Sequence, residues 1–225
     1  MKPWIALGLC LLSAAPAMAG TITGTVEAKG PVTTGPGEGE GVYASMRYKF
    51  AEKVDYDRLE DFVIYIDQAV PAAPDAGIHP ATITQRNVSF EPHVLAIAVG
   101  TTVRWPNADD IFHNVFSMSE TKEFNLGFYT KGDTPREIPF DKVGRVDVFC
   151  GIHSKMHCII LVLPNRYFTK VNARQHYFLP DLPAGTYKVT AWQERLPSQS
   201  REIAVPAQGD VRMDFVLGLT GLPKP

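Results

Sequence analysis

The sequence lacks several features that mark common classes of protein. Its 225 residues carry 22 Lys and Arg against 24 Asp and Glu, so the basic surface typical of nucleic-acid-binding proteins is missing. It contains no glycine-rich phosphate loop, no Gly-x-Ser-x-Gly elbow and no His-Glu-x-x-His zinc motif. Beyond the N-terminus, no apolar run is long enough to span a membrane as a helix. We therefore expect no nucleic-acid partner, no membrane span and none of these enzyme classes.

The N-terminal segment has the features of a signal peptide. Lys2 supplies a positive start, residues 5–12 form a short apolar run, and Ala17-Met18-Ala19 is a small-x-small cleavage site. We expect residues 1–19 to be removed on export, with the periplasm as the destination. Cys10 would leave with this segment.

Helix periodicity is also almost absent, and strand-like segments recur instead. They are rich in Val, Ile, Thr, Phe and Tyr, and the chain's 18 Gly and 18 Pro supply turns between them. The expected strands are 21–27, 62–67, 94–99, 102–105, 112–117, 145–150, 157–163, 176–179, 186–192, 200–205 and 211–217. Many short strands separated by turns predict an all-β fold built of sandwiches.

Three potential metal ligands lie close together in the stretch 148–158. A thiol, an imidazole and a thioether occur within seven residues, as Cys150, His153 and Met156. Alternation along 145–150 turns Cys150 toward the core, where a thiolate is costly unless a cation neutralises it. Sulfur and imidazole together favour copper, in a trigonal site with methionine as a weak axial ligand.

The fourth ligand must come from elsewhere in the chain, and His113 is the obvious candidate. It opens an expected strand, so it could face the Cys-His-Met loop from a rigid support. Asn114, its neighbour, could form a hydrogen bond across to the Cys150 loop and orient the ligands. The sequence thus predicts one copper ion held by His113, Cys150, His153 and Met156.

These elements resemble the cupredoxin, or blue-copper, family. The stretch 99–107 (Val-Gly-Thr-Thr-Val-Arg-Trp-Pro-Asn), then His113-Asn-Val, then Cys150-x2-His153-x2-Met156 occur in that family's order. The short loop is most similar to that of amicyanins, and plastocyanin is a more distant relative. The chain is also similar to exported proteins labelled methylamine-utilisation proteins.

The resemblance covers roughly residues 82–163 of the chain. It implies a Greek-key β-sandwich with the same four side chains as ligands of one type 1 copper. It further implies electron transfer without chemistry on a substrate, so that the protein is not an enzyme. Redox proteins, such as a c-type cytochrome or a periplasmic dehydrogenase, would be its partners.

A second resemblance lies near the C-terminus. Residues 178–192, Phe-Leu-Pro-Asp-Leu-Pro-Ala-Gly-Thr-Tyr-Lys-Val-Thr-Ala-Trp, look like the transthyretin-like, or carboxypeptidase regulatory-like, β-sandwich. Neither 20–75 nor 165–225 has enough strands for a core of its own. We therefore predict that these two pieces form one discontinuous sandwich, with a cupredoxin domain, 76–164, inserted between them.

Several alternatives stay open on sequence alone. Cys150 and Cys158 could form a disulfide in a sandwich that binds no metal, since exported thiols pair readily. Cys158 could instead be a small buried apolar residue, or join a zinc site with two histidines. The same ligands could serve copper trafficking rather than electron transfer. His157 is expected to be structural or exposed, and His93 to be packed rather than to bind metal.

Overall fold

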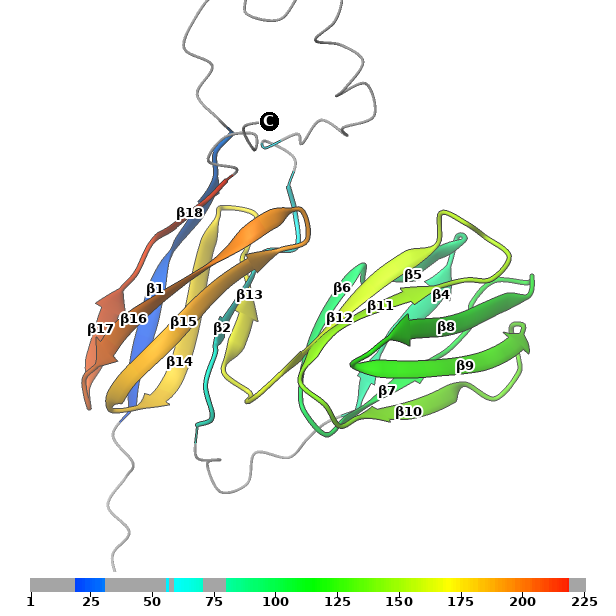
Figure 1. Ribbon diagram of the computed structural model, residues 1–225, viewed down its shortest axis with the longest axis horizontal. Coiled ribbons are helices and arrows are strands. Elements are labelled where there is room, and N and C mark those ends of the chain that lie inside the picture. The colour runs from blue at the N-terminus through cyan, green and yellow to red at the C-terminus, as the bar shows by residue number, and fades with distance from the viewer. Residues whose placement is uncertain (1–18, 31–55, 57–58, 71–79, 219–225) are drawn as a thin grey trace, which may run out of the picture.

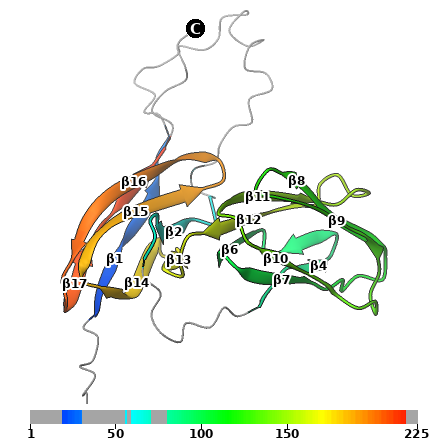
Figure 2. The ribbon, with the colours of Figure 1, turned by 60° about the horizontal axis from the view of Figure 1, so that its bottom comes forward.

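The computed structural model describes residues 19–30, 56, 59–70 and 80–218. Within these ranges the regular elements are β-strands, without an α-helix, and they form two sandwiches side by side (Figures 1 and 2). The all-β prediction is therefore confirmed. No helix in this part of the chain is long and apolar enough to cross a membrane. The predicted signal peptide up to residue 18 and the predicted boundary between residues 75 and 76 lie outside the described residues.

The central sandwich is formed by residues 80–163. Its larger sheet has the strand order β6-β12-β11-β8-β9, and a smaller sheet has the order β10-β7-β3. A two-stranded hairpin, β4-β5, completes it. Side chains from the two main sheets share one buried core, which also contains Cys150 and Met156. The strands are β3 (Ala81–Thr82), β4 (Thr84–Arg86), β5 (Ser89–Glu91), β6 (Val94–Ala98), β7 (Thr101–Trp105), β8 (His113–Ser119), β9 (Lys122–Tyr129), β10 (Arg136–Phe140), β11 (Gly144–Phe149) and β12 (His157–Leu163).

The flanking sandwich combines strands from both sides of the central one. In one sheet β1 pairs with β14, β17 and β18, and in the other the strand order is β13-β2-β15-β16. Strands that precede residue 70 therefore share sheets and a core with strands that follow residue 165. Its likeness to transthyretin-like domains stays a prediction. The strands are β1 (Ala19–Ala28), β2 (Val63–Ile66), β13 (Phe168–Lys170), β14 (His176–Pro183), β15 (Gly185–Gln193), β16 (Leu196–Val205), β17 (Gly209–Arg212) and β18 (Phe215–Leu217).

A third buried cluster joins the two sandwiches. Ile159, Leu161 and Leu163 on one face of β12 pack with Val63 of β2 and Val94 of β6. The opposite face of β12 belongs to the central core, and that of β2 to the flanking core. Burial on both faces explains why these two strands are almost continuously apolar rather than alternating. We call this cluster the junction.

Candidate metal centre

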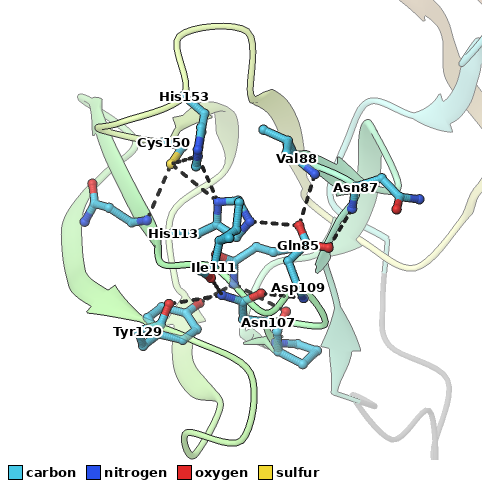
Figure 3. A network of polar contacts seen from close by, with 12 residues as sticks. Gln85, Asn87, Val88, Asn107, Asp109, Ile111, His113, Tyr129, Cys150 and His153 are labelled. Atoms are coloured by element: carbon cyan, nitrogen blue, oxygen red, sulfur yellow. Dashed lines mark hydrogen bonds and ion pairs between the residues drawn. The ribbon is translucent and has the colours of Figure 1, made fainter.

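His113 is buried at the start of β8, with no exposed surface. The turn before it is shaped by Asn107, whose amide donates to the carbonyl oxygens of Ile111 and Tyr129 and accepts the N–H of Asp109. This turn carries the Asp109 carboxylate back to the His113 ring, with Oδ2 2.8 Å from Nε2 (Figure 3). A carboxylate only accepts, so Nε2 holds the proton and Nδ1 of the neutral ring is left as a ligand atom.

Asp109 is itself held by several donors. The backbone N–H groups of Asn87 and Val88 donate to its two oxygens at 2.8 and 3.0 Å. Burial alone would raise the pKa of Asp109, but the hydrogen bonds from Val88, His113 and Asn87 lower it below its ordinary value. The carboxyl group is therefore ionised at neutral pH and acts as an acceptor for His113.

Cys150 and Met156 begin and end a tight loop between β11 and β12. The Cys150 N–H donates to the Met156 carbonyl at 3.2 Å, and the Met156 N–H donates to the His153 carbonyl at 2.9 Å. Gly151 permits a close approach, because a Cβ there would lie 2.9 Å from Oδ1 of Asn114. The loop therefore turns both Cys150 and His153 toward β8.

Three of the four predicted ligands converge. Nδ1 of His113 lies 3.0 Å from Nδ1 of His153, and the Cys150 Sγ lies 3.6 Å from His153 Nδ1 and 4.0 Å from His113 Nδ1 (Figure 3). His113 comes from β8, and Cys150 and His153 come from one loop that follows 37 residues later. They form a group that could hold one metal ion.

The spacing of the donors fits a single transition-metal ion. Nitrogen and sulfur ligands bind such ions at about 2.0–2.3 Å, so two of them on one ion lie roughly 3 to 4 Å apart. Two imidazoles and one thiol are also the ligand set of trigonal copper sites. The residues present therefore fit the copper that the sequence predicts.

Met156 is buried, with 1% of its surface exposed, in the same core cluster as Cys150. Met156 ends the loop that begins at Cys150, and its carbonyl oxygen accepts a hydrogen bond from the Cys150 N–H. Its role as the axial ligand stays a prediction.

Asn114 reaches the site through its backbone rather than its side chain. Its N–H donates to the Cys150 sulfur at 3.5 Å. Its side-chain amide donates to Oδ1 of Asn125 and to the Gly127 carbonyl, both on β9. Asn114 therefore forms a hydrogen bond to Cys150, but from its backbone N–H. Its side-chain amide holds β8 against β9.

The two remaining cysteines are free thiols, so the disulfide alternative is wrong for this structure. Cys158 lies on β12 opposite Val148 of β11 and is fully buried. Burial, together with the nearby Asp147 charge, raises the pKa of Cys158 well above its ordinary value. Cys158 is a neutral core residue, and the donor group around Cys150 does not include it.

Sequence reasoning missed Asp109. The signal for it is the Asn107-Ala-Asp109-Asp110 run, which reads as a turn just before a histidine. Which of the two aspartates turns back onto the ring depends on the Asn107 hydrogen bonds, and these are visible only in the folded chain.

Comparisons with known proteins show a likeness to solved structures that is limited to part of this chain. No protein-family model and no curated protein matches the chain. A purple cupredoxin from Nitrosopumilus maritimus is 29% identical over 36% of this chain and 98% of its own, with a TM-score of 0.33. Amicyanin from Paracoccus versutus is 25% identical over 44% of this chain and 96% of its own, with a TM-score of 0.34. The similar structures include cupredoxins.

A copper-containing nitrite reductase from Thermus scotoductus SA-01 is similar as well. It is 29% identical over 44% of this chain, with a TM-score of 0.36, and only 26% of its own length is matched. All three likenesses are limited to less than half of this chain. The function of the site must therefore be argued from its own residues.

Proposed function

We propose that the protein is an exported copper protein that carries electrons between redox proteins of the periplasm. His113, Cys150, His153 and Met156 would hold one type 1 copper ion. The observation that carries this proposal is the convergence of one thiol and two ring nitrogens within 4.0 Å of one another. When bound, copper would supply one-electron chemistry by alternating between Cu(II) and Cu(I).

The chain's own contribution is to hold these donors still. Asp109 fixes the orientation of the His113 ring, and the Asn114 N–H stabilises negative charge on the Cys150 sulfur. His113 and Cys150 are both buried, and Cys150 belongs to the core of the central sandwich. Groups held in this way move little when charge changes, which favours rapid electron transfer.

An exposed apolar rim around the site suits a docking redox partner. Ile111 and Phe112 precede His113, Ile152 precedes His153, and Phe128 pairs with Asn114 across β8 and β9. All four side chains are between 45% and 59% exposed. Transient redox encounters use small interfaces, and this rim provides one for a c-type cytochrome or a periplasmic dehydrogenase. The proposal assigns no substrate chemistry to the site.

The first test is a copper titration of the metal-free protein followed by visible absorption. One equivalent of Cu(II) should produce an intense thiolate-to-copper band. The band should be absent from Cys150→Ser and retained by Cys158→Ala, the matched control for the second buried thiol. A band that survives Cys150→Ser would show that another group binds the copper.

Repeated reduction and oxidation of the copper-loaded protein distinguishes electron transfer from copper trafficking through the same ligands. An electron carrier keeps its copper through repeated reduction and oxidation, so the visible band should return fully after each cycle. Loss of copper to a weak Cu(I) chelator on each reduction would favour trafficking instead.

A further inference from the structure

A second group of potential metal ligands lies beside the junction. His93, His157 and Glu194 each offer one ligand atom, and these atoms all lie within 4.8 Å of one another. None of the three belongs to the His113-Cys150-His153 group.

The backbone brings the three residues together from both sandwiches. His93 immediately precedes β6, and His157 opens β12, the parallel neighbour of β6. The backbone N–H of Ile159 donates to the His93 carbonyl at 2.8 Å and fixes the two segments in register. Glu194 comes from the flanking sandwich, in the turn between β15 and β16. An ion bound here would therefore join the two sandwiches.

Both ring nitrogens of His93 contact oxygen atoms that can accept a hydrogen bond. Nδ1 of His93 lies 3.2 Å from the His157 carbonyl oxygen, which can only accept, so Nδ1 carries the proton. In the neutral ring Nε2 is then an acceptor, yet it lies 2.7 Å from Oε2 of Glu194, another acceptor. At this distance a second proton on the ring supplies the positive charge between the two acceptors. A metal ion can take the place of that proton once the two atoms move apart to the roughly 3 to 4 Å that ligands of one ion need.

His157 is oriented as metal-binding histidines commonly are. Its Nε2 lies 3.0 Å from Oδ1 of Asp147, which leaves Nδ1 available to a metal. Arg145 donates to both oxygens of Asp147, and the His157 ring stacks on Phe149 with centroids 4.8 Å apart. A carboxylate on the second nitrogen of a ligand histidine fixes the ring and strengthens its binding of metal.

The group is open to ions from solvent. His93 and Glu194 line a surface hollow of about 280 Å³ together with the acidic residues Glu60 and Asp61 and the basic residue Arg195. The side chains of His93 and Glu194 are 42% and 26% exposed. A hydrated cation can therefore reach His93 and Glu194 without opening the fold.

We propose that His93, His157 and Glu194 form a binding site for a divalent transition-metal ion of the zinc class, which links the two sandwiches. Two imidazoles and one carboxylate, with a position left for water, are ligands that zinc accepts. The group has no sulfur to select Cu(I) and too few oxygens for calcium. The proposal is independent of electron transfer at Cys150.

The test counts zinc bound per chain after dialysis of metal-free protein against low-micromolar free Zn²⁺. The wild type should hold two ions, because zinc also accepts the thiol and imidazoles around Cys150. Glu194→Gln should hold one ion, Cys150→Ser should hold one, and the double variant should hold none. Asp147→Asn should lower the zinc affinity of the His93-His157-Glu194 site roughly 10- to 100-fold, because the neutral amide orients the His157 ring less firmly.

Glu202→Gln, a like substitution on exposed β16, should keep two ions and serves as the control. Circular dichroism of each variant checks that it is folded. As a second readout, Zn²⁺ should raise the melting temperature of the copper-loaded wild type and leave that of copper-loaded Glu194→Gln unchanged.

The proposal is overturned if Glu194→Gln and His93→Asn both keep as much zinc as the wild type. In that case His93 and Glu194 form an ordinary ion pair. If instead Cys150→Ser keeps two ions while Glu194→Gln keeps one, the second site stands and the proposed ligand role of Cys150 fails.

Discussion

At the scale of single residues, one hydrogen bond decides which nitrogen of His113 faces the thiol. Asp109 accepts from Nε2 and so presents Nδ1 to Cys150 and His153. The same carboxylate caps the Asn87–Val88 turn, where both residues have positive φ values of 52° and 57°. A valine in this region is strained, and its N–H bond to Asp109 helps to hold it there.

We predict that Asp109→Asn lowers the affinity for copper roughly 10- to 100-fold, because the neutral amide holds the ring less firmly. A competition titration with a chelator of known affinity measures the change. Asp110→Asn, the exposed neighbour, should bind copper as the wild type does. Equal affinities in the two variants would mean that Asp109 does not position His113.

The proposed ligands could be selected from the sequence because their chemical types are rare in this chain and three of them are closely spaced. With two cysteines left after residue 19, Cys150 beside His153 and Met156 could be recognised without a structure. The role of Asp109 and the contact between His93 and Glu194 could not be predicted from the sequence. They depend on turns and on a contact between sandwiches, and 101 positions separate His93 from Glu194 in the chain.

At the scale of elements, most strands follow the predicted alternation, and the exceptions have local causes. The predicted strand 211–217 is divided into β17 and β18, both parallel to β1 in one register. At the break, the Asp214 carboxylate takes the Thr25 N–H and hydroxyl at 2.8 and 2.9 Å. Gly24 leaves room there, because a Cβ would clash with the Met213 carbonyl. A side chain thus replaces part of the backbone ladder.

Six strands were not predicted: the short β3, β4, β5 and β13, and the longer β9 and β10. Both longer strands contain a residue that usually interrupts strands, Gly127 in β9 and Pro139 in β10. β9 lies at an edge of the larger sheet and exposes many of its side chains, so its apolar alternation is weak. Tertiary pairing with β8 and β7, rather than local preference, makes them strands.

The Asp214 contacts predict a stability that depends on pH. Hydrogen bonding to Arg212 is the main cause that lowers the pKa of Asp214 from 3.8 to about 2, with Thr25 contributing as well. Since the folded pKa is the lower one, this stabilisation is complete above about pH 4 and is lost as the pH falls toward 2. Asp214→Asn should cost about 1 kcal/mol at pH 7, a value reduced for solvent screening of a half-exposed group.

Urea unfolding at pH 7 and near pH 2 measures this difference, which should fall to a small fraction of its size at the lower pH. Asp210→Asn on β17 is exposed and provides the matched control. A cost that stays constant across the pH range would assign the effect to the Thr25 hydrogen bonds rather than to the charge.

At the scale of the whole molecule, the junction packs the central sandwich against the flanking sandwich. β12 contributes one face to each of two buried clusters, so the strand after the ligand loop also carries the contact with the neighbouring sandwich. The sequence indicated that 20–75 and 165–225 belong together, because neither has enough strands alone. It could not indicate this packing, since an apolar run does not specify what covers each face.

We predict that Ile159→Ala, at a fully buried position of the junction, destabilises the protein by about 2 to 5 kcal/mol. The loss combines buried apolar contact with an unfilled cavity between the sandwiches. Ile152→Ala, the same substitution at a position that is 51% exposed, should change stability by less than about 0.5 kcal/mol. Chemical denaturation of both variants is the measurement, and equal midpoints would show that the junction contributes little.

The central claim is that Cys150, His113 and His153 bind one copper ion together. X-ray absorption at the copper edge of the protein loaded with one equivalent of copper tests it most directly. We predict one sulfur and two imidazole nitrogens bound to the ion, with the sulfur signal lost in Cys150→Ser. Copper surrounded only by nitrogen and oxygen in the wild type would contradict the account.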